Sequence, residues 1–386
     1  MSTNELDQVK TLLREPPPPS GDAAAKALTL LRDEMDGGRV RTGRRRFGWP
    51  AGLGAGLVAT GAAAAVAIVA AGGPADPGSP TAPPVDLNRK AVLAAASKAE
   101  QLPTGKYWYT DSVDGQSYVI RAKTGTYAIT AASSESFNWT GAKRGMGEAY
   151  YLRDLPARPQ TARDEALWRR AGSPSTFRVQ GDGRVNTYTT EQAKWRSSGP
   201  EAGSQPGGGG EFTGPRPGGS SLEDLQKLPT DPAELAELFL APGAGDPSGV
   251  GPSGTKQAEP GPSNAYGQIW RTASVLGGPL PSKVRAGLMR ALAQQPGVHA
   301  IGRATDPLGR TGVALATGDR AQADHRSRSV IIFDQGTGAL LSVQEQLTKP
   351  GGEYAEMKPG FVINYQLERA SGWTNAKPKP PAELPF

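Results

Sequence analysis

The stretch VHAIGRATDPLGRTGVALA, residues 298–316, is followed by SVIIFDQGTGALLSVQEQL (329–347) and by GFVINYQLE (360–368). Short apolar runs rich in β-branched residues alternate here with turn-forming residues. Asp306-Pro307 and the glycines of the segment 336–338 supply the backbone geometry of tight turns. This pattern is the most regular in the chain, and it predicts five antiparallel strands between Val298 and Glu368.

A second β-rich region lies earlier in the chain. It contains four segments with many aromatic and β-branched residues: KYWYT (106–110), QSYVIRA (116–122), TYAITA (126–131) and SFNWT (136–140). Asp114-Gly115, between the first two segments, is a turn signal. Because the segments lie so close together, we expect an antiparallel meander of four strands.

The aromatic side chains of this region have two interpretations. Tyr107, Tyr109, Tyr118 and Trp139 form a candidate ligand face, because aromatic rings line many apolar binding sites. The alternative is that the same rings pack against a helix as part of the core. A cavity lined by these rings, as opposed to a filled core, distinguishes the two.

Helices are predicted between the two β-rich regions and before them. At Asp231, an aspartate cap, Pro232 in the first turn and Glu234 in a capping box mark a helix start. Thr161 with Asp164 marks another. The predicted helices cover residues 87–101 and 161–170, short segments that begin at 221 and 231, and residues 264–276 and 281–294.

Residues 51–71, AGLGAGLVATGAAAAVAIVAA, carry no charge, and a helix of this length spans about 30 Å, the thickness of the hydrocarbon core of a bilayer. Arg44, Arg45 and Arg46 precede this run and Trp49 lies at its boundary, so the positive-inside rule places the N-terminus in the cytoplasm. The sequence therefore predicts a transmembrane helix over residues 47–73. The protein is expected in the cell membrane as a single-pass protein, with its C-terminal domain outside the cell.

Two other interpretations of the apolar run stay open. Residues 44–47 partly match a twin-arginine export signal, and residues 69–71 match a small-residue cleavage site, so the run is alternatively a cleaved signal. A soluble core helix is the third interpretation, although such a helix normally shows polar residues at its own period.

The remaining chain divides by composition. Residues 1–46 are predicted to form a cytoplasmic head with two short helices. Because two short helices cannot bury a core alone, we expect this head to be partly disordered. A Pro/Gly stalk follows over 74–86, then an extracytoplasmic domain over 87–375 with disordered loops near 197–220 and 241–262, and a loose tail over 376–386.

The composition excludes several kinds of chemistry. The 386 residues include no cysteine and two histidines, His299 and His325, which removes thiol nucleophiles, disulfides and the common zinc motifs. Neither a GxxxxGK[ST] phosphate loop nor a GxSxG elbow occurs. The formal net charge of +6 is mild and much of it precedes the apolar run, so nucleic acid is not an expected partner. We expect no enzymatic activity, no cofactor and no metal.

Two pairs of charged residues near the predicted turns have competing interpretations. As a carboxylate pair, Asp306 and Asp334 would suit hydrolysis, but aspartate is also an ordinary residue of hairpin turns. Arg303 and Arg310 flank one turn, where they either hold an anion or lie solvated at a hairpin tip.

Several motifs follow one another in a recognisable order: PTGKYWYT (103–110), DEALWRRAGSP (164–174), LPTDPAELAELF (228–239) and, most specific, the segment 280–345. In these motifs the chain resembles an uncharacterised family of actinobacterial single-pass membrane proteins. The resemblance implies a short cytoplasmic head, one membrane helix and an extracytoplasmic α+β domain, often encoded beside an extracytoplasmic-function sigma factor. It implies no catalytic residues, because none are established for the family.

The predicted fold class is therefore α+β: a short cytoplasmic helical head, one transmembrane helix, and an extracytoplasmic domain with a curved antiparallel sheet packed on helices. The order of helix and sheet in this domain is similar to that of lipoprotein carriers, a likeness of fold only. The expected function is that of a non-enzymatic envelope sensor or regulatory component, anti-sigma-like, which holds a cytoplasmic regulator such as a sigma factor through residues 1–46. The alternative is a membrane-tethered module that binds a lipid or another hydrophobic ligand.

Overall fold

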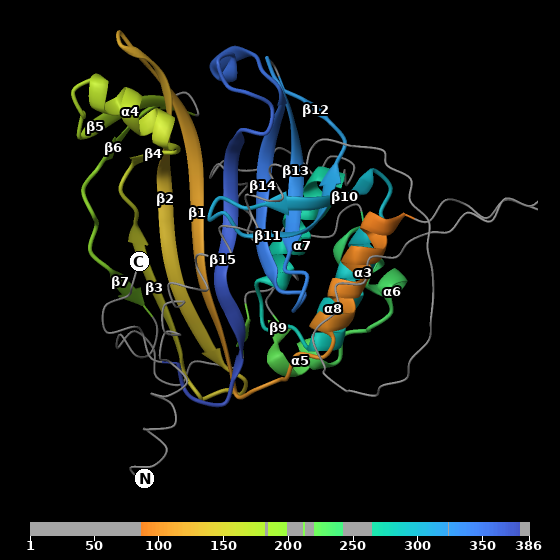
Figure 1. The fold of residues 1–386 in the computed structure, drawn as a ribbon. Helices are drawn as coiled ribbons and strands as arrows, with labels where there is room; N and C mark the ends of the chain where they lie inside the picture. Colours follow the sequence, from red (N-terminus) through yellow and green to blue (C-terminus); the bar gives the residue numbers. More distant parts are fainter. Residues whose placement is uncertain are drawn as a thin grey trace, which may run out of the picture. The chain divides into compact units, whose positions relative to one another are not determined.

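The computed structural model describes residues 86–181, 184–198, 211–212, 220–241, 265–322 and 324–378. These residues belong to one compact unit, Thr81–Phe386. They form a large antiparallel sheet and a layer of helices on one of its faces (Figure 1).

The main sheet has eleven strands in the order β10-β11-β13-β14-β15-β1-β2-β3-β7, with β12 beside β13 and β4 beside β2. Its pairings are antiparallel. The N-terminal strands make one half and the C-terminal strands the other, and the pairing of β15 with β1 joins them. The strands are β1 (Tyr107–Ala122), β2 (Gly125–Gly141), β3 (Glu148–Asp154), β4 (Arg158–Pro159), β7 (Arg196–Ser198), β10 (Val298–Thr305), β11 (Thr311–Thr317), β12 (Arg320–Ala321), β13 (Arg326–Phe333), β14 (Leu340–Lys349) and β15 (Val362–Thr374).

Smaller elements surround this sheet. Two two-stranded sheets pair β5 (Thr176–Gly181) with β6 (Arg184–Thr189), and β8 (Glu211–Phe212) with β9 (Ser220–Ser221). The helices are α3 (Leu87–Ala99), α4 (Ala162–Arg170), α5 (Leu222–Gln226), α6 (Pro232–Phe239), α7 (Ala265–Leu276), α8 (Ser282–Ala293) and the 3-10 turn η2 (Gly352–Tyr354).

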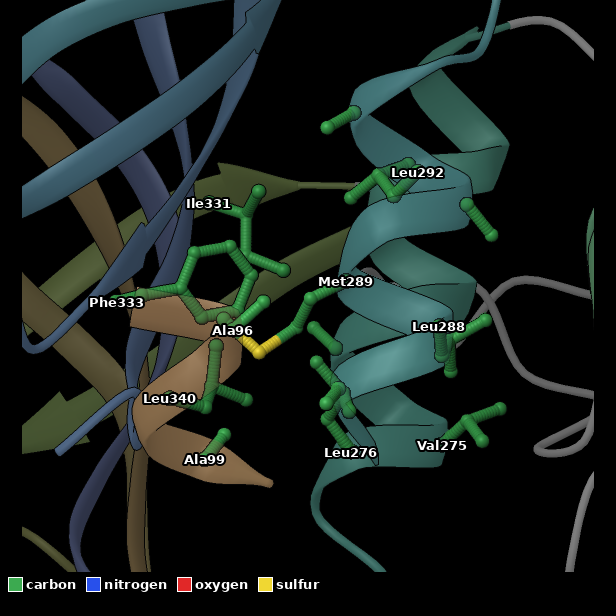
Figure 2. Close-up of a cluster of buried hydrophobic side chains, with 14 of the residues drawn as sticks. Ala96, Ala99, Val275, Leu276, Leu288, Met289, Leu292, Ile331, Phe333 and Leu340 are labelled. Carbon is green, nitrogen blue, oxygen red and sulfur yellow. The ribbon is translucent and has the colours of Figure 1, made fainter. Parts of the chain in front are cut away.

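The main core lies between the helix layer and the C-terminal half of the sheet. Strand alternation brings Ile331 and Phe333 of β13 to the helix side. Helical spacing brings Leu288, Met289 and Leu292 of α8 to the same core, where they are fully buried (Figure 2). Burial of a side chain of this size stabilises the fold by about 1.5–3 kcal/mol, so this core is a principal source of stability.

The opposite face of the same strands is also buried, because the β10–β11 hairpin folds across it. Ala314, Val330 and Ile332 lie on this face, with residues of β10 packed against them. At the hairpin tip, Arg310 Nη2 donates to the carbonyl oxygen of Leu341 at 3.0 Å. The tip of the β10–β11 hairpin, where Asp306-Pro307 forms the predicted turn, therefore lies over β14.

The five C-terminal strands predicted from the sequence are confirmed as β10, β11, β13, β14 and β15. The capped helix starts are confirmed as well: Thr161 accepts a hydrogen bond from the backbone N–H of Asp164, and Asp231 accepts one from that of Glu234. These features depend on local chemistry, which a sequence records directly. The strands β3 to β9 and the short strand β12 were not predicted.

The predicted four-strand meander is wrong. The structure forms two long strands, β1 and β2, and the expected turn at Asp114-Gly115 lies inside β1. The register shifts between Asp114 and Gln116, which marks a bulge. A Cβ at Gly115 would lie 2.5 Å from the ring of Tyr365, so this glycine accommodates the close approach of a neighbouring ring.

The predicted fold class is also wrong, because the described chain is mostly antiparallel sheet and none of its helices is long and apolar enough to cross a membrane. Its longest helix, α3, has 13 residues and carries Arg89 and Lys90 in its first turn, and a helix of that length spans only about 20 Å. The single-pass anchor and the membrane localisation are corrected accordingly. The predicted transmembrane helix 47–73, its flanking residues Arg44, Arg45, Arg46 and Trp49, the head 1–46 and the stalk to residue 85 lie outside the described residues.

Gly338, in the turn between β13 and β14, allows α3 to dock. Its φ is +72°, and a Cβ there would lie 2.1 Å from the backbone oxygen of Ala95 in α3. We expect Gly338→Ala to lower the free energy of unfolding by about 2–4 kcal/mol, because backbone strain adds to a clash with backbone atoms.

Gly309→Ala is the matched control for this prediction. Gly309 also has a positive φ, of +81°, but no atom lies within 4 Å of its Cβ position. The free energy of unfolding of the Gly309→Ala variant is expected to fall by only about 1 kcal/mol, the contribution of backbone strain alone. Equal losses in urea denaturation of the two variants would contradict the docking role of Gly338.

Candidate functional site

The helix side of the sheet continues past the helices as a polar face. Trp108 of β1 points to the helix layer, where its indole N–H donates to the carbonyl oxygen of Gly277 at 3.1 Å. Strand alternation therefore places Thr110, Ser112 and Asp114 on the same side. We define the polar face by residues of β1, β2 and β15 that share this side: Thr110, Ser112, Asp114, Ser136, Asn138, Thr140 and Glu368.

Two acidic residues lie close together on the polar face. Ser112 pairs with Glu368 and Asp114 pairs with Gln366, so Asp114 and Glu368 are diagonal neighbours on adjacent strands, about 7 Å apart. Burial raises the pKa of Asp114 to about 6. Burial, and next the charge of Asp114, raise the pKa of Glu368 to about 8. Buried Oε2 of Glu368 has no hydrogen-bond partner in the described chain.

A buried cation lies beside Glu368 but is held by other groups. Arg285 of α8 donates from Nη1 to the Leu276 carbonyl oxygen at 2.5 Å and from Nη2 to that of Gly278 at 2.9 Å. Its guanidinium also stacks on Trp108, 4.8 Å from the ring centroid. Burial lowers the pKa of Arg285 to about 10, and the charge of Glu368 acts in the opposite direction. Arg285 therefore caps the end of α7 and leaves the carboxyl group of Glu368 available.

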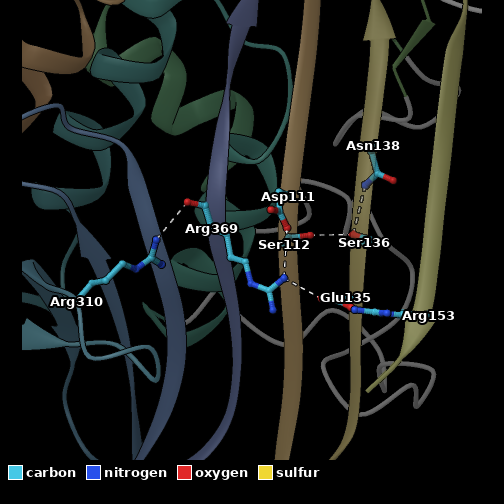
Figure 3. Close-up of polar contacts among 8 residues, drawn as sticks. All are labelled: Asp111, Ser112, Glu135, Ser136, Asn138, Arg153, Arg310 and Arg369. Carbon is cyan, nitrogen blue, oxygen red and sulfur yellow. Dashed lines mark hydrogen bonds and ion pairs between the residues drawn. The ribbon is translucent and has the colours of Figure 1, made fainter. Parts of the chain in front are cut away.

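Hydroxyl and amide groups extend the polar face along β2. The Ser112 and Ser136 hydroxyl oxygens lie 2.9 Å apart, and Asn138 Nδ2 donates to Ser136 Oγ at 3.4 Å (Figure 3). Asn138 Oδ1 and Thr140 Oγ1 are buried without a partner in the described chain. Together with Glu368 Oε2, they offer a ligand three oxygens that can accept hydrogen bonds and have no partner in the described chain.

The other face of these strands carries a closed ion network. Glu135 is fully buried; its Oε1 accepts from Arg153 Nε, and its Oε2 accepts from Arg369 Nη1 at 2.8 Å (Figure 3). Arg369 also lies 3.8 Å from Asp111 Oδ1, and burial raises the pKa of Asp111 to about 6 despite this cation. Because both oxygens of Glu135 are used, this network braces the strands and is a poor binding site.

The predicted aromatic residues fall into two clusters. Tyr107, Tyr109 and Trp139 pack together with Phe137 on the face opposite the helices, and Trp139 is only 2% exposed. Tyr118 lies in a separate cluster beneath α4 with Tyr127, Ile129 and Leu167, and its hydroxyl is 3.1 Å from that of Tyr188. The structure thus brings three of the four residues of the candidate ligand face together.

The remaining charged candidates have local roles. Asp306 accepts from Arg310 Nε at 2.7 Å and from two backbone N–H groups of its own turn. Asp334 accepts from the N–H groups of Gly336 and Thr337. His325 packs edge-on against a tyrosine ring. Within the described ranges, no group of three metal-ligating side chains occurs.

Sequence reasoning missed the acidic pair. Asp114 was interpreted as part of a turn, and Glu368 as the end of a predicted strand. The available signal was an acidic residue within a β-rich segment, but the pairing of the two residues depends on the register of β1 with β15.

Comparisons with known proteins add no family. The chain matches no family model, and no curated protein matches it. The resemblance to actinobacterial single-pass proteins therefore stays a prediction.

We expect Glu368→Gln to change how stability depends on pH. The pKa of Glu368 is higher in the folded chain than in the unfolded chain, so the folded state binds this proton more tightly, and stability falls as the pH rises from about 4 to about 8. The variant is expected to match the wild type at pH 4 and to exceed it by about 2 kcal/mol at pH 8.

Urea denaturation across this pH range measures the effect. Glu237→Gln, at an exposed position of α6, is the control and should follow the wild-type curve. A Glu368→Gln curve parallel to that of the wild type at every pH would contradict the assignment.

Proposed function

We propose that residues 86–378 form the non-enzymatic binding module of a regulatory protein, and that the polar face is its recognition surface. The observation that carries this proposal is the buried Oε2 of Glu368, which lies beside Asp114 and has no hydrogen-bond partner in the described chain. An unpaired carboxyl of this kind destabilises a fold, and strongly perturbed ionisable groups are concentrated at functional sites.

The chemistry of the polar face indicates the ligand class. It carries the carboxyl groups of Asp114 and Glu368 on adjacent strands, and Glu368 Oε2, Asn138 Oδ1 and Thr140 Oγ1 can accept hydrogen bonds and have no partner in the described chain. Such a set is complementary to a positively charged group that donates several hydrogen bonds, and a primary amine has both properties. Binding of an amine would restore partners to oxygens that the fold leaves without them.

The same surroundings favour binding over catalysis. The hydroxyl of Ser112, the nearest potential nucleophile, is hydrogen-bonded to the hydroxyl of Ser136 and not to a base. Nucleophilic catalysis needs an adjacent general base or a lowered pKa at the nucleophile. The raised pKa values of the two carboxyl groups would suit a general base, but in the described chain neither carboxyl group forms a hydrogen bond with Ser112.

Titration calorimetry of the full-length protein with putrescine tests the ligand class. We expect binding to strengthen as the pH rises from 6 to 9, because Asp114 and Glu368 then become charged while the amine stays largely protonated. Glu368→Gln and Asp114→Asn should each weaken binding about tenfold or more.

Two controls accompany this titration. Butanol lacks the charge and should give no signal, and Glu237→Gln should bind putrescine as the wild type does. Unchanged affinity in both Glu368→Gln and Asp114→Asn would overturn the proposal.

The regulatory part of the proposal rests on sequence alone. Residues 1–46, which lie outside the described residues, carry an amphipathic stripe of Leu6, Val9, Leu12 and Leu13 suited to a protein partner. We propose that they hold a regulator such as a sigma factor. A sigma factor should co-purify with the full chain and be lost with Leu12→Glu/Leu13→Glu; recovery of none with the wild type would contradict this role.

An apolar ligand on the aromatic residues, the other expectation from the sequence, has less support. Tyr118 lies apart from Tyr107, Tyr109 and Trp139, and the rings of the larger cluster pack on one another.

A further inference from the structure

Trp139 lies where three parts of the chain converge. Its ring meets that of Tyr107 edge to face, with centroids 5.9 Å apart and planes at 76°. On another side, Gly147, with a φ of +87°, brings the β2–β3 turn against the ring: a Cβ there would lie 3.2 Å from it. In such a pair the electropositive edge of one ring contacts the electron-rich face of the other, and the two ring planes bound a corner.

A cation already occupies this corner. Lys377 Nζ lies 5.0 Å from the centroid of the Trp139 ring, within the range of a cation–π interaction. The chain brings it there directly after β15: Thr374 pairs with Tyr107, and the backbone N–H of Ala376 donates to Thr374 Oγ1 at 3.2 Å. Lys377 is exposed, and a cation–π contact at an exposed site contributes only about 0.5–1 kcal/mol.

A second observation points to an occupant other than lysine. The indole Nε1 of Trp139 is buried without a hydrogen-bond acceptor in the described chain, and the residue is 2% exposed. A lysine side chain has no acceptor to offer this donor. A ligand that carries a cationic group and an oxygen a few bonds away would satisfy both the ring and its N–H group.

We propose that the corner of Trp139 and Tyr107 is a binding site for a quaternary ammonium group with a nearby oxygen, as in choline, and that Lys377 is its internal competitor. Quaternary ammonium groups are recognised by aromatic rings in this way, because the charge is spread over methyl groups that contact the ring face. The site lies on the face opposite Asp114 and Glu368, so it is independent of the proposed amine site.

Choline chloride is the probe for the first experiment, titrated into the full-length protein by calorimetry. Dimethylbutanol, the neutral carbon isostere of choline, reports any binding due to shape alone. We expect choline to bind and the isostere to give no signal. Lys377→Ala should bind choline about two- to fivefold more tightly, the factor that corresponds to an exposed cation–π contact of about 0.5–1 kcal/mol.

Variants of the rings complete the test. Tyr107→Leu, at a half-buried position, should weaken choline binding about fivefold or more, and Trp139→Phe should do the same if circular dichroism shows it folded. Tyr150→Leu, an exposed tyrosine of β3 outside this cluster, is the matched control and should leave binding unchanged.

Three results would overturn the proposed choline site, and vesicle flotation identifies the source of its ligand. Absence of choline binding in Lys377→Ala, equal binding of the neutral isostere, or unchanged binding in Tyr107→Leu would each overturn the proposal. Flotation of Lys377→Ala with phosphatidylcholine vesicles, reduced by Tyr107→Leu, would identify a lipid headgroup as the source; binding of choline without flotation would identify the free compound. Glu368→Gln should affect neither, which keeps this test distinct from that of the amine site.

Discussion

The pairing of β15 with β1 is the constraint on which the rest of the structure depends. It runs from Tyr107 opposite Thr374 to Gln116 opposite Asn364, and it joins two half-sheets that are far apart in the sequence. We call this pairing the seam, and the acidic pair, the ion network of Glu135 and the aromatic corner all lie beside it. The register sets Trp108 against Trp373, Ser112 against Glu368 and Asp111 near Arg369. A shift by one residue would move each of these side chains to the opposite face.

The two faces of the seam treat buried charge in opposite ways. On one face Glu135 is matched by two arginines, which offset the desolvation of its carboxylate. On the other face Glu368 lies near Arg285, whose hydrogen bonds go to backbone carbonyl oxygens. Glu135 is fully buried and Glu368 is half-buried, and only Glu135 has an arginine partner at each of its oxygens. This contrast within one pair of strands is why we assign bracing to the first group and binding to the second.

The sequence predicted what depends on neighbours along the chain. The hairpins around Asp306 and Asp334 and the capped start at Asp231 follow from local hydrogen bonds, and the structure contains all three. The prediction of a turn at Gly115 was wrong, because the glycine makes room for the ring of Tyr365 on another strand. The same limit applies to the acidic pair and to Lys377 over Trp139: each needs the register of β15, which no local pattern encodes. The membrane prediction was corrected because no helix of the described residues is long and apolar enough to cross a membrane, while the apolar run 51–71 itself lies outside them.

The seam also has a consequence for how the chain matures. β1 and β2 are adjacent in sequence and pair as soon as both exist, whereas the second partner of β1 is the last strand of the described chain. Until β15 is synthesised, β1 presents an open edge with several aromatic side chains, a surface that invites pairing with other chains. We therefore expect folding of this domain to end with the pairing of β15 and β1. This step is slow because the two strands are far apart in the sequence. In a nascent chain stalled before residue 362, β1 would be paired with β2 but would lack its second partner. Its unpaired edge would be a binding site for a chaperone.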